Sequence, residues 1–399
     1  MHSKLNAPVF QRADGERSAT WLELFFDLVF VVSVAALSYR LEHHFNWGGV
    51  ALLCVYFLPV WWMWMEYSYY ADLFDDNSTL YQWLMIAGMA GVMHLALVMR
   101  SDVTAGSRLY ELGYLYLAGV ALVMYLRAYR LYPELRWFCR RFAGTIALSM
   151  GCFAGSLLLE APYRYVAWVV GVLIQAAAAP SIYLIRRDYP VQLSHMPERF
   201  GLFSIIVLGE GIVALTAASQ AEAWEWPVAF CVLGGFALTV CLWKLYFYEA
   251  SKDTITEQLR RSDRRSTVMS FLYGYSHYFL YLSIMLISVA ILLLIESTAA
   301  GHHVPELAVR LLHGSCVLFL LTITLIHWAA PESLFASVVY ARAACVGLSL
   351  VLLLLHLPAV AEVYAQVIVL GGLILVEYLI YRSRDAVPGR EEEQITQGA

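Results

Sequence analysis

The segment FGLFSIIVLGEGIVALTA, residues 200–217, decides the fold class. It is apolar or small at almost every position, and its one charged residue, Glu210, lies between Gly209 and Gly211. A helix needs about 20 mostly apolar residues to cross a bilayer core. The chain as a whole is 61% hydrophobic and 14% charged, whereas soluble domains have roughly 45–50% and about 25%. The sequence therefore predicts an integral membrane protein.

Further apolar stretches of similar length define the predicted architecture. We count twelve of them, at residues 21–41, 48–70, 81–99, 109–131, 139–159, 163–185, 200–220, 226–249, 268–296, 307–328, 335–357 and 359–381. The predicted fold class is all-α, a polytopic membrane protein of about twelve transmembrane helices.

Lysine and arginine in the loops indicate the orientation, because cytoplasmic loops carry an excess of both. If the N-terminus is cytoplasmic, the inside segments carry 19 of these residues and the outside segments carry 4. The first apolar stretch contains Glu23 and Asp27 and has no small-residue cleavage site after it, so we expect it to stay as an anchor. The prediction is a protein of the inner (plasma) membrane with both termini cytoplasmic.

Two segments about half a chain apart resemble each other and indicate a weak internal repeat. WLELFFDLVFVVSVAAL at 21–37 aligns with MPERFGLFSIIVLGEGI at 196–212, which puts Glu23 over Glu198. Each half would hold six helices and start on the same side, so we expect parallel halves related by an axis along the membrane normal. The predicted divisions are 1–190, 191–385 and a disordered cytoplasmic tail, 386–399.

Two motifs carry a resemblance to a known family. WLELFFDLVFV near the N-terminus, with HMPERFGLFSIIVLGEG beginning at His195, resembles the bacterial low temperature requirement protein A family. The resemblance implies a polytopic inner-membrane protein linked by name to growth in the cold, without a substrate or a reaction. The positions that match the family pattern are Glu23, Phe26, Asp27, His195, Glu198, Arg199, Gly209 and Glu210.

Charged side chains inside the predicted spans are the candidate transport or coupling residues. Each costs roughly 2.5–3.5 kcal/mol on insertion scales and usually faces the bundle interior. Arg199 could pair with Asp27 or Glu23 if the first and seventh spans are neighbours. The candidates are Asp27, Glu210, Glu23, Arg199, Glu198, His94 and His277.

Glu210 is the principal candidate because it lies near the bilayer midplane. Its flanking glycines allow either close helix approach or a local break in the helix, and transporters place their sites at broken helices. We expect it at the interface between the halves, where it could take up and release a proton. The alternative is a protonated glutamic acid that bonds to a neighbouring helix.

The other candidates also have structural interpretations. Glu23 and Glu198 are each near a predicted helix start, where an acid is favoured by the helix dipole. Arg199 could be a structural clamp, and His94 and His277 could form ordinary bonds between helices. For Asp27 the alternatives are a role in transport and a buried ion pair.

Aromatic residues at the ends of spans 2 and 8 suggest a pocket for an organic substrate. WWMWMEYSYY, residues 61–70, contributes Trp61, Trp64 and Glu66, and CLWKLYFYEA contributes Trp243. The alternative for the tryptophans is an aromatic belt at the membrane surface, and Glu66 could snorkel to that surface.

Three functions remain after these observations. The first is a proton- or cation-coupled secondary transporter, the second an ion channel or passive pore, and the third a membrane enzyme acting on lipid. Because no GxxxxGK, HExxH or GxSxG motif occurs, we predict that the protein is not an enzyme. We expect no metal or cofactor, since no two of the seven cysteines form a CxxC pair.

The predicted partners are the lipid bilayer and a small solute or ion. No basic cluster alternates with aromatic residues, which argues against nucleic acid. A homo-oligomer remains open, since a channel usually repeats its path in an oligomer.

Overall fold

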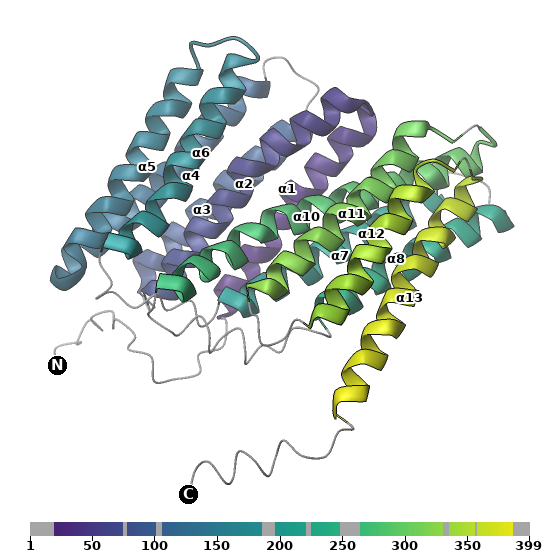
Figure 1. Cartoon of the computed structure of the whole chain (residues 1–399). Helices are drawn as coiled ribbons and strands as arrows, with labels where there is room; N and C mark the ends of the chain where they lie inside the picture. Colours follow the sequence, from purple (N-terminus) through teal and green to yellow (C-terminus); the bar gives the residue numbers. More distant parts are fainter. Residues whose placement is uncertain are drawn as a thin grey trace, which may run out of the picture. The chain divides into compact units, whose positions relative to one another are not determined.

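The computed structural model is built from helices. It describes residues 20–74, 78–100, 106–185, 196–220, 225–247, 264–302, 304–329, 335–355 and 357–385. Helices take up 92% of these residues, and no strand occurs among them. The helices, labelled in Figure 1, are α1 (Trp21–His43), α2 (Trp47–Leu73), α3 (Thr79–Arg100), α4 (Gly106–Leu131), η1 (Pro133–Leu135), α5 (Arg136–Ser156), α6 (Tyr163–Ile185), α7 (Met196–Gln220), α8 (Trp226–Phe247), α10 (Arg264–Ala299), α11 (Glu306–Trp328), α12 (Ala336–Leu352) and α13 (Ala359–Asp385).

Ten of the described helices are long and apolar enough to cross a membrane. The predicted spans 139–159 and 335–357 correspond to α5 and α12, neither of which is both long and apolar enough to be counted among these ten. Arginines at positions 136, 140 and 141 lower the hydropathy of α5, and α12 has 17 residues, fewer than the usual requirement of about 20. A multi-pass membrane protein is therefore supported, and twelve spans remain a prediction.

Contacts divide the chain into two compact units. The first is Met1–Gly211 with Ser251–Met285, and the second is Ile212–Ala250 with Leu286–Ala399. Helices α7 and α10 each begin in the first unit and end in the second. The halves predicted at 1–190 and 191–385 stay a prediction, and the predicted tail, 386–399, lies outside the described residues.

The first unit is a bundle with an aromatic interior. Its helix α1 packs on α2 and α3, α4 on α3 and α5, and α6 on α5 and α2 (Figure 1). Tyr114 stacks on Phe153 with ring centroids 3.6 Å apart, and Tyr125 stacks on Phe142 at 5.2 Å. These rings fill the spaces between helices, so the polar groups described below lie in a closely packed interior.

The second unit is a smaller bundle with an aliphatic interior. Helix α13 packs on α8 and α12, and α11 packs on α12. Buried Leu312, Leu320 and Ile323 of α11 contribute to its core, with Leu370 and Leu373 of α13. The polar side chains within this apolar surrounding are few and paired, as the next section describes.

Helix α7 continues through Glu210 without interruption. It runs from Met196 to Gln220, so the local break, one of the two alternatives that the flanking glycines allow, does not occur. A Cβ added at Gly209 would meet nothing within 4 Å, so the structure supplies no close helix contact at that glycine. Backbone hydrogen bonds of an intact helix satisfy the polar groups that a break would expose to the membrane.

Candidate functional site

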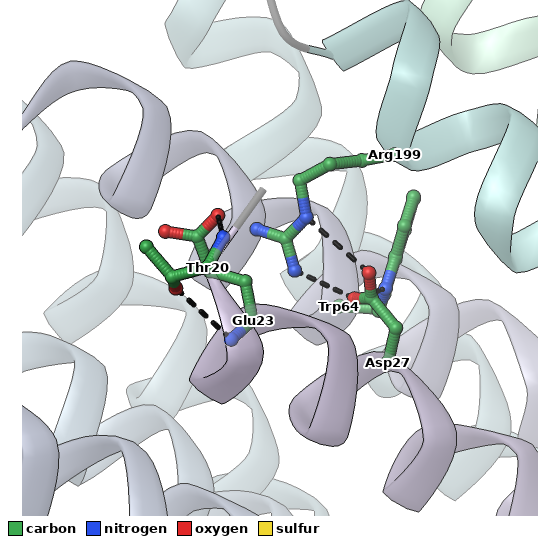
Figure 2. Close-up of polar contacts among 5 residues, drawn as sticks. All are labelled: Thr20, Glu23, Asp27, Trp64 and Arg199. Carbon is green, nitrogen blue, oxygen red and sulfur yellow. Dashed lines mark hydrogen bonds and ion pairs between the residues drawn. The ribbon is translucent and has the colours of Figure 1, made fainter. Parts of the chain in front are cut away.

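Asp27, Arg199 and Trp64 meet inside the first unit (Figure 2). They come from α1, α7 and α2. Nη2 of Arg199 donates to Oδ1 of Asp27 at 2.6 Å, and Nε of Arg199 faces Oδ2 at 3.4 Å. Nε1 of Trp64 donates to Oδ1 at 2.8 Å. The aspartate is fully buried and the arginine is 1% exposed, so this is an ion pair sealed from solvent.

The pairing of Arg199 with Asp27 was one of the predicted arrangements, and it is confirmed. It closes a sequence separation of 172 residues. Trp64 gives Oδ1 of Asp27 a second donor, and Nε of Arg199 bonds to Oδ2, so both carboxylate oxygens are bonded. Since a lone buried charge is costly in an apolar surrounding, Asp27 and Arg199 require each other.

Glu23 lies one turn before Asp27 and has a different role. Its backbone N–H donates to Oγ1 of Thr20 at 3.3 Å, and its carboxylate accepts from the backbone N–H of Thr20 at 3.3 Å (Figure 2). This capping box is a common start signal for a helix, and it agrees with the dipole interpretation of Glu23. Glu23 also acts electrostatically on Arg199, whose Nη1 is buried without a hydrogen-bond partner among the described residues.

The remaining candidates on α7 are less enclosed. Glu198 lies in the first turn of the helix next to Pro197 and is partly exposed. Glu210 is half-buried, and no hydrogen bond or ion pair to it is found among the described residues. Glu210 therefore lacks the sealed environment of Asp27.

The two histidine candidates differ in burial. His94 is exposed on α3, and its Nε2 faces the carbonyl oxygen of Leu109 at 3.1 Å. His277 on α10 is fully buried, with Nδ1 2.8 Å from the carbonyl oxygen of Tyr273 and its ring stacked on Phe200. The His94 contact joins α3 to α4, as the structural interpretation expects, whereas the bond of His277 to Tyr273 stays within α10 and its ring contact with Phe200 reaches α7. A proton-relay role for either residue stays a prediction.

The tryptophan-rich stretch of α2 faces inward. All of residues 61–70 except Met65 are buried, so the aromatic-belt alternative is wrong for this stretch. Glu66 is also buried, which excludes snorkelling, and its Oε1 has no hydrogen-bond partner among the described residues.

The residues of the predicted substrate pocket have separate surroundings. Trp64 bonds to Asp27, Trp61 packs edge-on against Tyr278, and Trp243 is 46% exposed. Neither cavity described below is lined by Trp61, Trp64, Glu66 or Trp243. A substrate pocket formed by these residues stays a prediction.

A second buried ion pair of the first unit was not predicted. Nε of Arg164 lies 3.2 Å from Oε1 of Glu111, at an angle that is not that of a hydrogen bond. The same oxygen accepts from Oγ of Ser156 at 2.8 Å and from Nε1 of Trp168 at 3.1 Å. Glu111 is fully buried, and Oε2 has no hydrogen-bond partner among the described residues. The pair joins α4 to α6.

The second unit holds a buried carboxylate–imidazole pair. Nε2 of His313 lies 2.9 Å from Oε2 of Glu362, and Nδ1 lies 2.9 Å from Oε1 of Gln366. Nε2 of Gln366 donates to Oγ of Ser349 at 3.0 Å, and the backbone N–H of Leu357 donates to Oε1 of Glu362 at 2.9 Å. The four side chains of this cluster are fully buried.

The bonds around His313 constrain its protons. With the amide oriented as described, Oε1 of Gln366 accepts a hydrogen bond from the N–H at Nδ1 of His313. Nε2 then faces a carboxylate oxygen, and a single proton between the two atoms belongs either to the histidine or to the glutamic acid.

A further buried pair joins α12 to α13. Nε of Arg342 donates to Oε1 of Glu377 at 2.7 Å, and Nη2 donates to Oε2 at 3.3 Å. Nη1 of Arg342 lies 3.0 Å from Nδ1 of His327. Because the guanidinium can only donate, Nδ1 accepts and the imidazole is neutral. The two-fold contact between planar groups has the geometry of a structural clamp.

One feature of the sequence indicates that these three further pairs contain buried charges. Glu111, Arg342, Glu362 and Glu377 are charges inside apolar stretches, and such residues in membrane helices usually face a partner. The signal does not identify the partner, because Glu111 with Arg164 and His313 with Glu362 are separated by about 50 residues.

Two cavities lie beside two of the buried pairs. A cavity of about 670 Å³ in the first unit is lined by Arg164 but not by Glu111. One of about 760 Å³ in the second unit is lined by Glu362 but not by His313. No group of three or more metal-ligating side chains occurs in the part of the chain that the structure describes.

Comparison with known proteins identifies a family match and a relative. A sequence profile of the bacterial low temperature requirement A protein matches residues 18–375. An uncharacterized protein from Rhizobium meliloti (strain 1021) is 23% identical over 274 residues, which is 66% of this chain and 66% of that protein. The matched segment of the chain thus spans slightly under two thirds of the relative. The profile includes Asp27, Arg199, Glu210 and the His313–Glu362 pair and ends before Glu377.

Proposed function

The chain belongs to the bacterial low temperature requirement A family, and from the buried ionisable groups of this multi-pass membrane protein we propose a proton- or cation-coupled secondary transporter. The proposal assigns no catalytic step to the chain. The observation that carries it is the His313–Glu362 pair. Both side chains are fully buried, and Glu362 lines a cavity large enough for a small solute.

The pair provides what proton coupling requires. A proton held between Nε2 of His313 and Oε2 of Glu362 can leave only if the resulting charge is compensated, because an uncompensated charge in an apolar surrounding is costly. A cation that enters the cavity supplies that compensation, whereas an anion that enters it favours the pair that keeps its proton. Proton occupancy and solute occupancy are thereby linked through one carboxylate.

Three predicted residues have supporting roles in the proposal. Glu210 is a second protonation site, since it is half-buried in the middle of an apolar helix and forms no hydrogen bond or ion pair with the described residues. Asp27 and Arg199 hold α1 and α7 together and would maintain the first unit during transport. The sealed ion pairs favour this carrier over an open polar pore, because no solvent reaches Asp27 or Glu111.

Two parallel repeats are part of the proposal, and helix spacing supports them. Helices α4 and α11 begin at residues 106 and 306, and α5 and α12 begin at 136 and 336, a separation of 200 in both cases. In the first unit a buried pair joins α4 to α6, the helix after α5. In the second unit a buried pair joins α11 to α13, the helix after α12. Ser149 bonds to the hydroxyl group of Tyr114 on α4, and Ser349, 200 residues later, bonds to the amide of Gln366 on α13.

Twelve spans, an inner-membrane location and cytoplasmic termini complete the proposal, and the topology can be tested directly. Reporter fusions at Gly398 and within 127–141 should both read cytoplasmic, because loop lysines and arginines favour that side. Fusions within 157–162 should read periplasmic. A periplasmic signal at either of the first two positions would contradict the topology.

Flux measurements test the transport function. We expect proteoliposomes with an internal pH-sensitive dye to show proton movement only when a transported solute is added, tested with a panel of small organic anions, organic cations and metal ions. Glu210→Gln should keep the protein folded, since the side chain has no partner to lose, and should abolish the coupled flux. Glu134→Gln, at an exposed position in η1, is the matched control.

Two results would defeat parts of this proposal. Proton or ion movement that does not depend on solute would indicate a pore instead of a carrier. Unchanged coupling in Glu210→Gln would reduce that residue to a structural role and leave His313–Glu362 as the proposed coupling site.

A further inference from the structure

The cavity of the first unit combines positive charge with apolar walls. Its volume is about 670 Å³, and it lies where the turn between α1 and α2 meets the segment between α5 and α6. Two arginines line it, Arg40 from α1 and Arg164 from α6, beside Leu37, Leu53 and Tyr56. Ligand pockets of 300–1,000 Å³ with a few convergent polar groups are typical of small-molecule sites.

Arg40 forms no ion pair with a carboxylate among the described residues. Its Nη1 donates to the carbonyl oxygen of Met99 at 3.4 Å, and its guanidinium lies 5.2 Å from the centre of the Tyr56 ring. Both partners are neutral, so the charge of Arg40 is not cancelled within the described residues. An anion in the cavity would supply the missing counter-charge.

Arg164 brings a second guanidinium to the same space and is only 7% exposed. Its charge is shared with Glu111, which lies behind it and does not line the cavity. Both arginines act electrostatically on Tyr56, so their charges converge on one side chain. Glu160 also lines the cavity but is exposed to solvent, where its charge is strongly screened.

We propose that this cavity binds a small organic anion, a carboxylate with an apolar body. Arg40 and Arg164 bind the carboxylate, and Leu37, Leu53 and the Tyr56 ring pack on the apolar part. The fork of a guanidinium matches a carboxylate, and two forks hold it more firmly than one. That this anion is the transported solute rests on the proposed transport function, whereas binding itself does not.

Equilibrium binding of radiolabelled benzoate to the purified full-length protein in detergent tests the site. We expect saturable binding that unlabelled benzoate displaces and that benzyl alcohol, which has the same ring without the charge, does not. Arg40→Gln should weaken binding at least tenfold. Arg136→Gln is the matched control, because Arg136 also lies over a tyrosine ring, that of Tyr129, but outside the cavity.

The role of the buried Arg164 must be tested with a variant that still folds. Replacing Arg164 alone would leave Glu111 without its cation, so we combine Glu111→Gln with Arg164→Gln, which removes both charges together. This double variant should also lose at least tenfold in affinity, and size-exclusion profile and thermal stability report its folding. If it does not fold, Arg40→Gln alone decides the proposal.

Three results would overturn the proposal. They are absence of saturable benzoate binding to the wild-type protein, equal displacement by benzyl alcohol, and unchanged affinity in Arg40→Gln. Loss of benzoate binding in phosphatidylglycerol nanodiscs, but not in phosphatidylcholine nanodiscs, would assign the cavity to an anionic lipid headgroup and also overturn it. Benzoate binding without flux would retain the site and refute the transport function, and flux without benzoate binding would do the reverse.

Discussion

Replacing Arg199 with methionine should lower the free energy of unfolding by about 3–5 kcal/mol, the usual cost of removing one partner from a buried ion pair. The variant leaves Asp27 fully buried with Trp64 as its remaining hydrogen-bond donor. We would measure unfolding in mixed micelles with increasing dodecyl sulfate. Arg310→Met is the control, because Arg310 forms an exposed pair with Glu306 one turn away, and exposed pairs contribute about 0–1 kcal/mol.

A double variant separates the ion pair from packing. Asp27→Asn combined with Arg199→Met removes both charges, and replacing a whole buried pair is often close to neutral. We therefore expect the double variant to recover most of the lost stability. If the single and double variants are equally unstable, the loss comes from the packing of the arginine stem and not from the charge left behind.

Glu362→Gln should reduce solute-driven proton flux at least tenfold. Glutamine keeps the size of the side chain and can still accept from the backbone N–H of Leu357. It cannot share a proton with His313, because an amide does not titrate in this range. Proton movement in proteoliposomes is the measurement, and Glu134→Gln is again the control.

A second readout distinguishes coupling from folding. Exchange of labelled for unlabelled solute, with no pH gradient, needs a folded carrier but no net proton transfer. We expect Glu362→Gln to keep this exchange and His313→Gln to behave in the same way. Wild-type proton flux in Glu362→Gln would show that the pair is structural, and loss of exchange together with flux would show a folding defect.

The sequence predicted the Asp27–Arg199 contact because several signals agreed. The two residues belong to motifs that align in the repeat, Pro197 indicates a helix start beside Arg199, and each charge is too deep to remain alone. The positions of most membrane spans were also predictable, because length and hydropathy can be read from each local stretch of sequence. Twelve stretches were counted, and ten of the described helices are long and apolar enough to cross a membrane.

What escaped sequence analysis depends on tertiary packing. The glycines beside Glu210 allowed a broken helix, but α7 keeps its backbone bonds, because intact bonds cost least in an apolar surrounding. The belt interpretation of residues 61–70 failed because amphipathic aromatic residues suit both a membrane surface and a polar interior. Glu362 was missed because hydropathy averages hide one acid among apolar neighbours, and nothing local selects His313 as its partner.

The two cavities differ in which member of a buried pair faces them. In the first unit the cation, Arg164, lines the cavity and the acid lies behind it, while in the second unit the acid, Glu362, lines the cavity and the base lies behind it. Like charges repel over the few ångströms that separate a wall from its contents. The buried pairs therefore present groups of opposite kind to the two cavities: a guanidinium, Arg164, in the first unit and a carboxyl group, Glu362, in the second.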